Sequence, residues 1–118
     1  MPDALRCLIR TLTLGCVAPL LAASAWAQAW PARQVTVLVP FPPGGGTDAF
    51  ARPLFAHLGK LTGKQFVIDN RGGAGGTLGA GVAARMPADG HSFFMGAVHH
   101  AIAPSVYKNL SYSLEGDF

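Results

Sequence analysis

Residues 34–48 read Gln-Val-Thr-Val-Leu-Val-Pro-Phe-Pro-Pro-Gly-Gly-Gly-Thr-Asp, and this stretch decides the fold. The run from Gln34 to Val39 is almost continuously apolar and β-branched, which predicts a strand buried on both faces, as in a parallel sheet. Three glycines follow, and a segment with helical spacing begins after them. A glycine-lined turn that opens a helix leaves free backbone N–H groups at the positive end of the helix dipole. The stretch therefore predicts a strand, an anion-binding turn and a helix, in that order.

The same arrangement occurs a second time further along the chain. Residues 65–69 (Gln-Phe-Val-Ile-Asp) predict a second strand, and Asn70-Arg-Gly-Gly-Ala-Gly-Gly-Thr77 follows it. We call residues 41–48 the first glycine loop and residues 70–77 the second glycine loop. Two such turns side by side would form a concave receptor for an anion such as a carboxylate or a phosphate.

The rest of the pattern predicts a third strand and a parallel sheet. A turn at residues 87–90 precedes the third strand at residues 92–96, and residues 97–100 form the exit from that strand. The predicted order is βαβαβ, and crossovers of this kind join parallel strands of one sheet. Ligands of such sheets bind beyond the carboxyl ends of the strands, where all three exits would lie. The predicted fold class is therefore α/β, a mainly parallel sheet with flanking helices.

Cap signals and apolar spacing set the predicted bounds of the first helix. Thr47 or Asp48 is suited to cap it, and it would end near Leu61, before Thr62-Gly63. Pro53 is expected to kink its first turns. The apolar residues that share one face of this predicted helix are Phe50, Leu54, Leu58 and Leu61.

A second helix, rich in small residues, is predicted to begin at a Thr77 cap and to run through Met86. Gly79 and Gly81 each weaken it by about 1 kcal/mol relative to alanine. Close packing of the helix on the sheet would offset that cost. Two further elements are predicted near the end of the chain, a short helix at residues 103–107 and an irregular segment at residues 112–118.

The first 27 residues have the pattern of a secretory signal peptide. A short basic segment with Arg6 and Arg10 precedes an apolar run at residues 12–23, and Ala25-Trp26-Ala27 matches the A-x-A cleavage site. The predicted mature chain starts at Gln28 and is periplasmic. An uncleaved anchor and a lipoprotein modified at Cys16 are the alternatives. Cys7 and Cys16 are the two cysteines of the sequence, so the predicted mature chain has no thiol and no disulfide.

The length and charge of the remaining residues limit the classes of function. The 118 residues allow one ordinary domain at most. After residue 27, seven Lys and Arg residues oppose five Asp and Glu residues, which gives a net charge of +2. These charges are scattered along the chain, whereas a nucleic-acid surface needs clustered Lys and Arg. We therefore expect no nucleic-acid partner.

The side chains of the loops have both structural and ligand-binding interpretations. Thr47 and Thr77 are first of all helix caps, although their hydroxyls could also face a ligand. The Asp48 carboxylate would repel an anion, so we expect it to hold loop backbone or water. Asn70 can donate to a ligand or brace its loop. The glycines themselves can serve tight turns and close helix–sheet packing with no ligand at all.

Three other kinds of site fit the sequence less well. Residues 44–49 formally match the dinucleotide pattern G-x-G-x-x-A, with Asp69 as the ribose-binding acid, but Phe-Pro-Pro separates the strand from the glycines. No G-x-S-x-G motif or paired carboxylates indicate a hydrolase. Adjacent His99 and His100 would point apart in an extended chain and lack a suitably spaced third ligand, so no metal site is predicted.

Several ordered motifs together are more specific than either glycine pattern. They run from Trp30 to Asp48, from Ile68 to Ala80, over Pro87-Ala-Asp-Gly-His91 and over residues 107–118. In these motifs the chain resembles the substrate-binding proteins of the tripartite tricarboxylate transporters, often called the Bug family. The resemblance covers nearly the whole predicted mature segment. One departure is Gly73, which stands near a position where the family usually has proline–glycine.

The resemblance implies a two-lobed periplasmic receptor with a type II binding-protein-like fold. Such a receptor closes around a small organic carboxylate and delivers it to membrane permease subunits, without catalysis and without a cofactor. The first two loops would hold one carboxylate through backbone groups and bridging waters, and residues 97–100 would add a polar contact. The candidate ligand-binding residues are Phe41, Pro43, Gly44, Gly45, Gly46, Thr47, Asp48, Asn70, Gly73, Ala74, Gly75, Gly76, Thr77, His99 and His100.

Residues 28–118 are interpreted as the N-terminal part of the first lobe of a monomeric receptor, with the second lobe absent. We expect such a part to lack the side chains that select among carboxylates. Two alternative functions stay open on the sequence. One is an exported α/β enzyme with an anion- or dinucleotide-binding glycine loop, and the other is a structural fragment that binds nothing.

Overall fold

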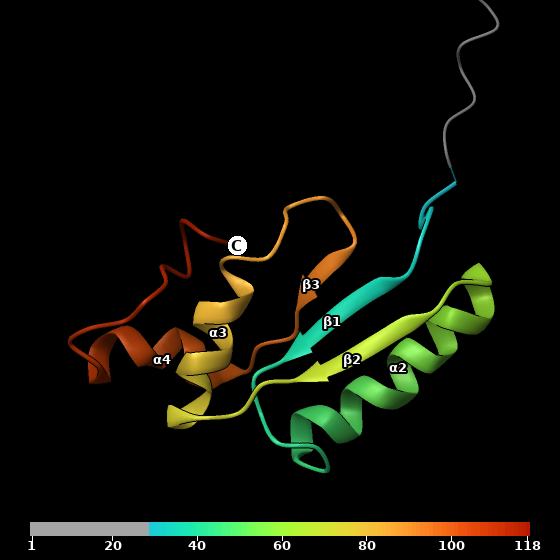
Figure 1. The fold of residues 1–118 in the computed structure, drawn as a ribbon. Coiled ribbons are helices and arrows are strands. Elements are labelled where there is room, and N and C mark those ends of the chain that lie inside the picture. Colours follow the sequence, from blue (N-terminus) through green and yellow to red (C-terminus); the bar gives the residue numbers. More distant parts are fainter. Residues whose placement is uncertain (1–28) are drawn as a thin grey trace, which may run out of the picture.

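A computed structural model describes residues 29–118 of the chain (Figure 1). The predicted signal peptide and its cleavage site after Ala27 lie outside these residues. The elements, in chain order, are β1 (Val35–Val39), α2 (Gly46–Thr62), β2 (Phe66–Asn70), the 3-10 turn η2 (Ala74–Gly76), α3 (Thr77–Ala83), β3 (Ser92–Phe94) and α4 (Val98–Val106). The predicted βαβαβ order is confirmed, and none of the helices described is long and apolar enough to cross a membrane.

The three strands form one parallel sheet in the order β2-β1-β3. Val35 pairs with Phe66 at one end of β1, and Val39 pairs with Asn70 at the other. The central strand is the most apolar, and Val35, Val37, Leu38 and Val39 are fully buried. Its near-continuous apolar sequence is explained by this position, because β1 has a neighbouring strand on each side and helices on both faces.

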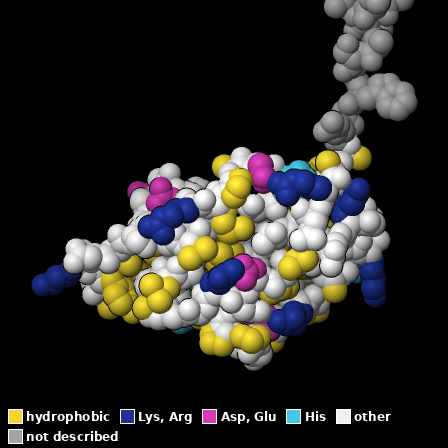
Figure 2. All heavy atoms as spheres, in the orientation of Figure 1, with side chains coloured by type: hydrophobic (Ala, Val, Ile, Leu, Met, Phe, Trp, Pro, Cys, Tyr) yellow, Lys and Arg dark blue, Asp and Glu magenta, His cyan; other side chains and the backbone are white. Residues whose placement is uncertain are grey.

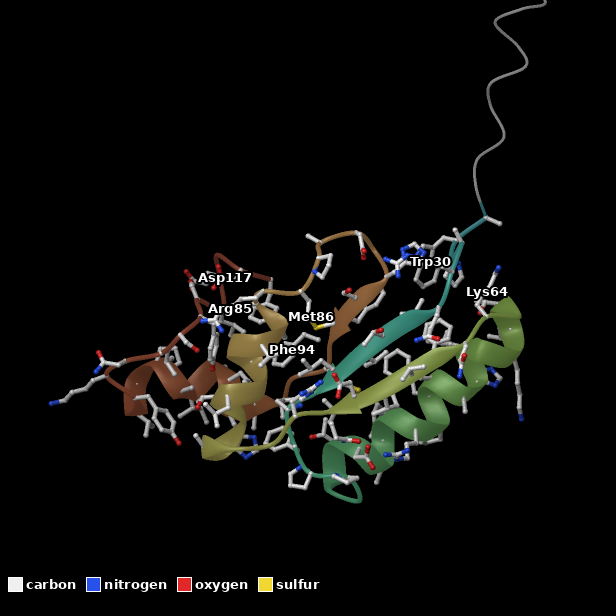
Figure 3. All side chains as sticks on the ribbon, viewed as in Figure 1. Trp30, Lys64, Arg85, Met86, Phe94 and Asp117 are labelled. Atoms are coloured by element: carbon white, nitrogen blue, oxygen red, sulfur yellow. The ribbon has the colours of Figure 1, made fainter. Side chains whose placement is uncertain are left out.

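Helices cover the two faces of the sheet. Neighbouring residues of a strand point to opposite faces, and Phe66 and Phe94 pair with β1 residues of opposite parity. On the first face, Phe55 of α2 stacks on Phe66 with ring centroids 5.8 Å apart. On the second face, Phe94 packs edge-on against His100 of α4, and Figure 3 shows Met86 and Phe94 beside α3. The chain therefore forms a three-layer α/β unit.

Helix α2 has a different cap and a different buried face from those predicted. It begins at Gly46 after an extended Gly45, so Asp48 is its third residue and neither Thr47 nor Asp48 is the cap. Asp48 and Ala51 are its buried residues, whereas Phe50, Leu54 and Leu61 are 66%, 41% and 69% exposed. Phe55 makes the contact with the sheet by stacking on Phe66. The predicted apolar stripe therefore does not form the centre of the buried face.

The other bounds of α2 are close to the prediction. The helix continues through Pro53, and Gly63 ends it in the left-handed conformation (φ +67°) with its N–H donating to the Gly59 carbonyl at 2.9 Å. This is the glycine-terminated C-cap that the sequence indicated.

Helices α3 and α4 also have bounds that differ from the prediction. Helix α3 ends at Ala83 rather than residue 86, and it follows a 3-10 turn with Gly76, not Thr77, at its N-cap. Residues 97–100 are not an open exit loop, because α4 already begins at Val98 and runs to Val106 through Pro104. Residues 112–118 have no helix or strand, as predicted.

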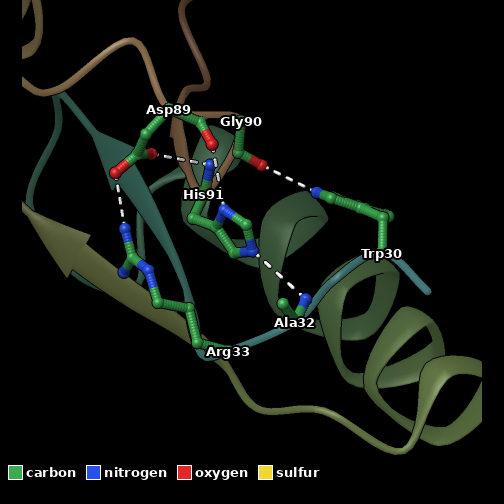
Figure 4. A network of polar contacts seen from close by, with 6 residues as sticks. All are labelled: Trp30, Ala32, Arg33, Asp89, Gly90 and His91. Carbon is green, nitrogen blue, oxygen red and sulfur yellow. Dashed lines mark hydrogen bonds and ion pairs between the residues drawn. The ribbon is translucent and has the colours of Figure 1, made fainter. Parts of the chain in front are cut away.

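A polar network fastens the chain before β1 to the turn before β3 (Figure 4). Trp30 Nε1 donates to a carbonyl of that turn at 2.8 Å, and the Ala32 amide donates to His91 Nε2 at 3.2 Å. His91 Nδ1 lies 3.0 Å from the Asp89 carbonyl, so it carries the ring proton and Nε2 is the acceptor. The residues of this network are Trp30, Ala32, Arg33, Asp89, Gly90 and His91. It closes the amino end of the sheet, away from the glycine loops.

Candidate carboxylate-binding site

The two glycine loops meet at the carboxyl end of the sheet (Figure 1). The first follows β1 and the second follows β2, and the last residues of these two paired strands are register partners. Asn70 Nδ2 donates to the Phe41 carbonyl at 3.1 Å, which ties the loops together. A Cβ added to Gly72 would lie 3.2 Å from Pro42, so the two backbones also pack directly against each other. The side-by-side arrangement that the sequence predicted is present.

The Asp48 side chain is the common acceptor of the hydrogen bonds that hold the first glycine loop. This side chain is buried, and it accepts hydrogen bonds from Arg52 Nε at 2.7 Å, the Gly44 amide at 2.8 Å and Asn70 Nδ2 at 2.9 Å. The Arg52 bond, followed by those from Gly44 and Asn70, lowers the pKa of Asp48 to about 2. Arg52 also donates to the Asn70 amide oxygen at 3.2 Å. As the sequence suggested, Asp48 holds loop backbone. Of the two roles that the sequence left open for Asn70, these hydrogen bonds correspond to bracing the loops.

The backbone amides of the first loop fall into two groups. The Gly44 amide is bonded to Asp48, and the Gly45 amide donates to the Pro42 carbonyl at 3.2 Å. The next three amides, at residues 46–48, form the first turn of α2, and none has a hydrogen-bond acceptor among residues 29–118. Such amides lie at the positive end of the helix dipole. They are the donors that this loop offers to an anion.

The second glycine loop depends on left-handed backbone conformations. Gly73, Gly75 and Gly76 have φ of +133°, +64° and +91°, a region that glycine adopts without strain. The Gly76 amide donates to the Gly73 carbonyl at 2.9 Å, and Thr77 Oγ1 donates to the Ala74 carbonyl at 2.9 Å. The Thr77 hydroxyl proton is therefore used within the loop, and Thr77 is the first residue of α3, after the Gly76 N-cap.

Residues 97–100 lie beside the two glycine loops. His99 is exposed and its ring centroid is 5.3 Å from that of Phe41. His100 is buried, and its ring is 5.9 Å from the Phe41 ring. The two histidines therefore both approach the first loop, but from different depths.

Two residues of the site were not singled out from the sequence. Arg52 pairs with Asp48, and its position four residues further along a helix was a usable signal. Tyr107, at the end of α4, places its hydroxyl 3.0 Å from where a Gly75 Cβ would lie. Nothing in the sequence spacing indicated that approach.

Other features of residues 29–118 concern the metal, dinucleotide and nucleic-acid sites that the sequence did not favour. No cluster of three or more His, Cys, Asp or Glu residues is placed there to hold a metal ion. Asp69 forms an ion pair with Arg71 at 3.0 Å. The strand order β2-β1-β3 also differs from the 3-2-1 order of the dinucleotide-binding fold. On the face seen in Figure 2, the Lys and Arg side chains are dispersed.

Comparison with known proteins places this geometry in a family. A family model described as the tripartite tricarboxylate transporter family receptor matches residues 50–117. Protein BugT of Bordetella pertussis (strain Tohama I) is 40% identical over 97 residues, which cover 76% of this chain and 30% of BugT.

Solved structures give the same result. The R. palustris protein Rpa4515 with adipate is 46% identical (TM-score 0.68), and the match covers 71% of this chain and 28% of that one. The periplasmic binding protein BugD is 42% identical (TM-score 0.67), again over 71% of this chain and 28% of its own. The chain thus spans less than a third of the length of these relatives. It belongs to the receptor family of the tripartite tricarboxylate transporters, which includes the Bug proteins.

Proposed function

We propose that this chain takes part in capturing a small organic carboxylate in the periplasm, as part of one lobe of a two-lobed receptor. The observation that carries the proposal is the first turn of α2, where the amides of residues 46–48 have no acceptor among the described residues and lie beside the second glycine loop. Rpa4515, which shares this fold, was solved with the dicarboxylate adipate. The proposed role is binding without chemical conversion, followed by delivery to membrane permease subunits.

The electrostatics of the loops favour an anion over a neutral solute. The buried charge of Asp48 is compensated by Arg52 at 2.7 Å, so the negative side chain of the first glycine loop is already paired. A hydrogen bond from an amide to a charged group contributes about 1.5–3 kcal/mol, roughly twice a neutral one. Preorganised amides need little reordering when the ligand arrives, and this lowers the entropic cost of binding.

We further propose that residues 1–27 act as the cleaved export signal of this receptor. The proposal is supported by the A-x-A pattern before Gln28 and by the similarity to the periplasmic binding protein BugD. N-terminal sequencing of the chain recovered from a periplasmic extract tests the expected start.

Removing one amide tests the proposed ligand grip. Gly46 is the first residue of α2, where proline is well tolerated, and the extended Gly45 before it suits a following proline. Gly46→Pro therefore deletes one candidate N–H donor with little change in fold. We expect adipate affinity, measured by isothermal titration calorimetry, to fall about tenfold or more.

The matched control is Gly46→Ala. A Cβ at this position meets no atom within 4 Å, and the amide is retained. We expect this variant to bind adipate like the wild type. Equal affinities for the proline variant, the alanine variant and the wild type would show that this amide does not hold the ligand.

A further inference from the structure

His100 connects segments that are far apart in the sequence. Its ring is 2% exposed, with Nδ1 3.0 Å from the Ala97 amide nitrogen and Nε2 3.3 Å from the Gly76 carbonyl oxygen. Ala97 follows β3, and Gly76 belongs to the second glycine loop. The same ring packs edge-on against Phe41 of the first glycine loop and Phe94 of β3.

The bonding partners define the tautomer of His100. The Gly76 carbonyl can only accept, so Nε2 carries the proton and donates to it. Nδ1 is then the acceptor for the Ala97 amide. The Ala97 carbonyl already accepts from the His100 backbone amide at 3.0 Å, so it does not need the ring. Both nitrogens of a neutral imidazole are thus used inside the protein, and neither is left for a ligand.

The Gly76 end of this connection lies in a glycine-rich backbone, which has the fewest steric restrictions on its conformation. Gly75 and Gly76 both have positive φ and no side chain, so the second glycine loop has many alternative conformations in the absence of a fixed contact. A Cβ on Gly76 would lie 3.1 Å from His100 Nε2 and 3.2 Å from Phe41, so the loop and the ring are closely packed. His100 is therefore placed to restrict this loop.

We propose that His100 is a positioning residue that tethers the second glycine loop to the exit of β3 and holds it ready for the carboxylate, without touching the ligand. This proposal rests on the proposed carboxylate-binding function. It assigns the two neighbouring histidines different roles, because His99 is exposed beside Phe41 whereas His100 lies behind the loop.

Two isosteric substitutions separate the two hydrogen bonds. The Asn side chain places an acceptor near the position of Nδ1, so His100→Asn keeps the Ala97 bond and loses the Gly76 bond. The longer Gln side chain places its NH₂ group near the position of Nε2, so His100→Gln keeps the Gly76 bond. His57→Asn, on the exposed surface of α2, is the matched control for loss of an imidazole.

The first readout is amide hydrogen exchange at residues 73–77 in the ligand-free chain. We expect exchange there to become at least tenfold faster in His100→Asn and to stay close to wild type in His100→Gln and His57→Asn. The second readout is adipate affinity, which should fall at least fivefold in the Asn variant and recover in the Gln variant. A role in general stability alone would instead make both His100 variants lose melting temperature, protection and affinity together.

The outcomes distinguish the two proposals. Equal behaviour of the Asn and Gln variants in exchange and in affinity would overturn the positioning role of His100. A wild-type chain that binds no adipate, but shows the expected exchange pattern, would count against the proposed ligand and would support the tether itself.

Discussion

Each end of the sheet carries an Asp and a His whose side chains form hydrogen bonds, but the two ends leave the backbone in different states. At the amino end, His91 accepts from the Ala32 amide and Asp89 accepts from the His91 amide, so the network binds one segment of chain to another. At the carboxyl end, Asp48 holds the Gly44 amide, while the amides of residues 46–48 have no acceptor among residues 29–118.

The comparison shows what distinguishes the candidate site from the opposite end of the sheet. Similar side chains occur at both ends of the sheet, so the presence of Asp and His does not distinguish the ends. The difference lies in backbone donors that face outward at a helix start. Side-chain networks at the carboxyl end serve to hold those donors in place.

The largest expected effect comes from a substitution that disturbs the backbone packing at the carboxyl end of the sheet. A Cβ on Gly79 would collide with the Arg71 carbonyl and lie 2.8 Å from Pro40 Cα, both of them backbone atoms beside the glycine loops. We expect Gly79→Ala to destabilise the chain by about 3 kcal/mol, at the upper end of overpacking costs, because backbone cannot move aside as a side chain can. Urea unfolding measures the change.

Gly81→Ala in the same helix is the control. Its Cβ would meet the Ser111 hydroxyl, the end of an exposed side chain that can rotate away. Alanine favours a helix by about 1 kcal/mol over glycine. We therefore expect Gly81→Ala to be at least as stable as the wild type, and more stable than Gly79→Ala. Equal destabilisation by both substitutions would contradict the close contact of α3 with the backbone at Pro40 and Arg71.

A pair of substitutions, one at each end, tests the division of roles. Asp48→Asn removes the charge that Arg52, Gly44 and Asn70 hold, and should weaken adipate binding about tenfold as the first loop loosens. Asp89→Asn weakens the Arg33 pair and should leave adipate affinity unchanged. Calorimetric titration of both variants measures the difference. A loss of affinity from Asp89→Asn equal to that from Asp48→Asn would contradict the separation.

The smallest expected effect is the change of the unfolding free energy with pH that is due to Asp48. The pKa of Asp48 is about 2 in the folded chain, below the value of about 3.9 for an unperturbed Asp. The unfolded chain therefore binds more protons in this range, and the Asp48 contribution to stability is complete above about pH 4 and is lost as the pH falls towards 2. The unfolding free energy of the wild type should decrease more steeply between pH 4 and pH 2 than that of Asp48→Asn. Parallel curves would contradict the low pKa.

The features that the sequence predicted best depend on local pattern. The β-branched run at residues 34–39 gave a strand that is observed at Val35–Val39, and the glycine runs gave loops that meet at one edge. Both follow from chain periodicity and from the geometry of parallel crossovers. Gly63 ends α2 as expected, because its left-handed conformation is a local requirement.

The features that the sequence did not predict depend on tertiary contacts. The stripe of Phe50, Leu54, Leu58 and Leu61 is regular, but only Leu58 of the four is half-buried, and the stack of Phe55 on Phe66 contributes to the face of α2 that meets the sheet. Asp48 resembled a helix cap, and its actual partners include Asn70, 22 residues further along the chain. Likewise, the ring of His100 meets Gly76, which is 24 residues earlier. Spacing along the chain carries no signal for such distant pairs.

The amides at the start of α2, which lack an acceptor among residues 29–118, have a consequence for how such a protein changes over time. Every residue except proline brings the same N–H group to a given position, so most substitutions there leave the donor in place. A lineage can therefore exchange the surrounding side chains, and with them its preferred acid, while the proposed main-chain contact to a carboxylate persists.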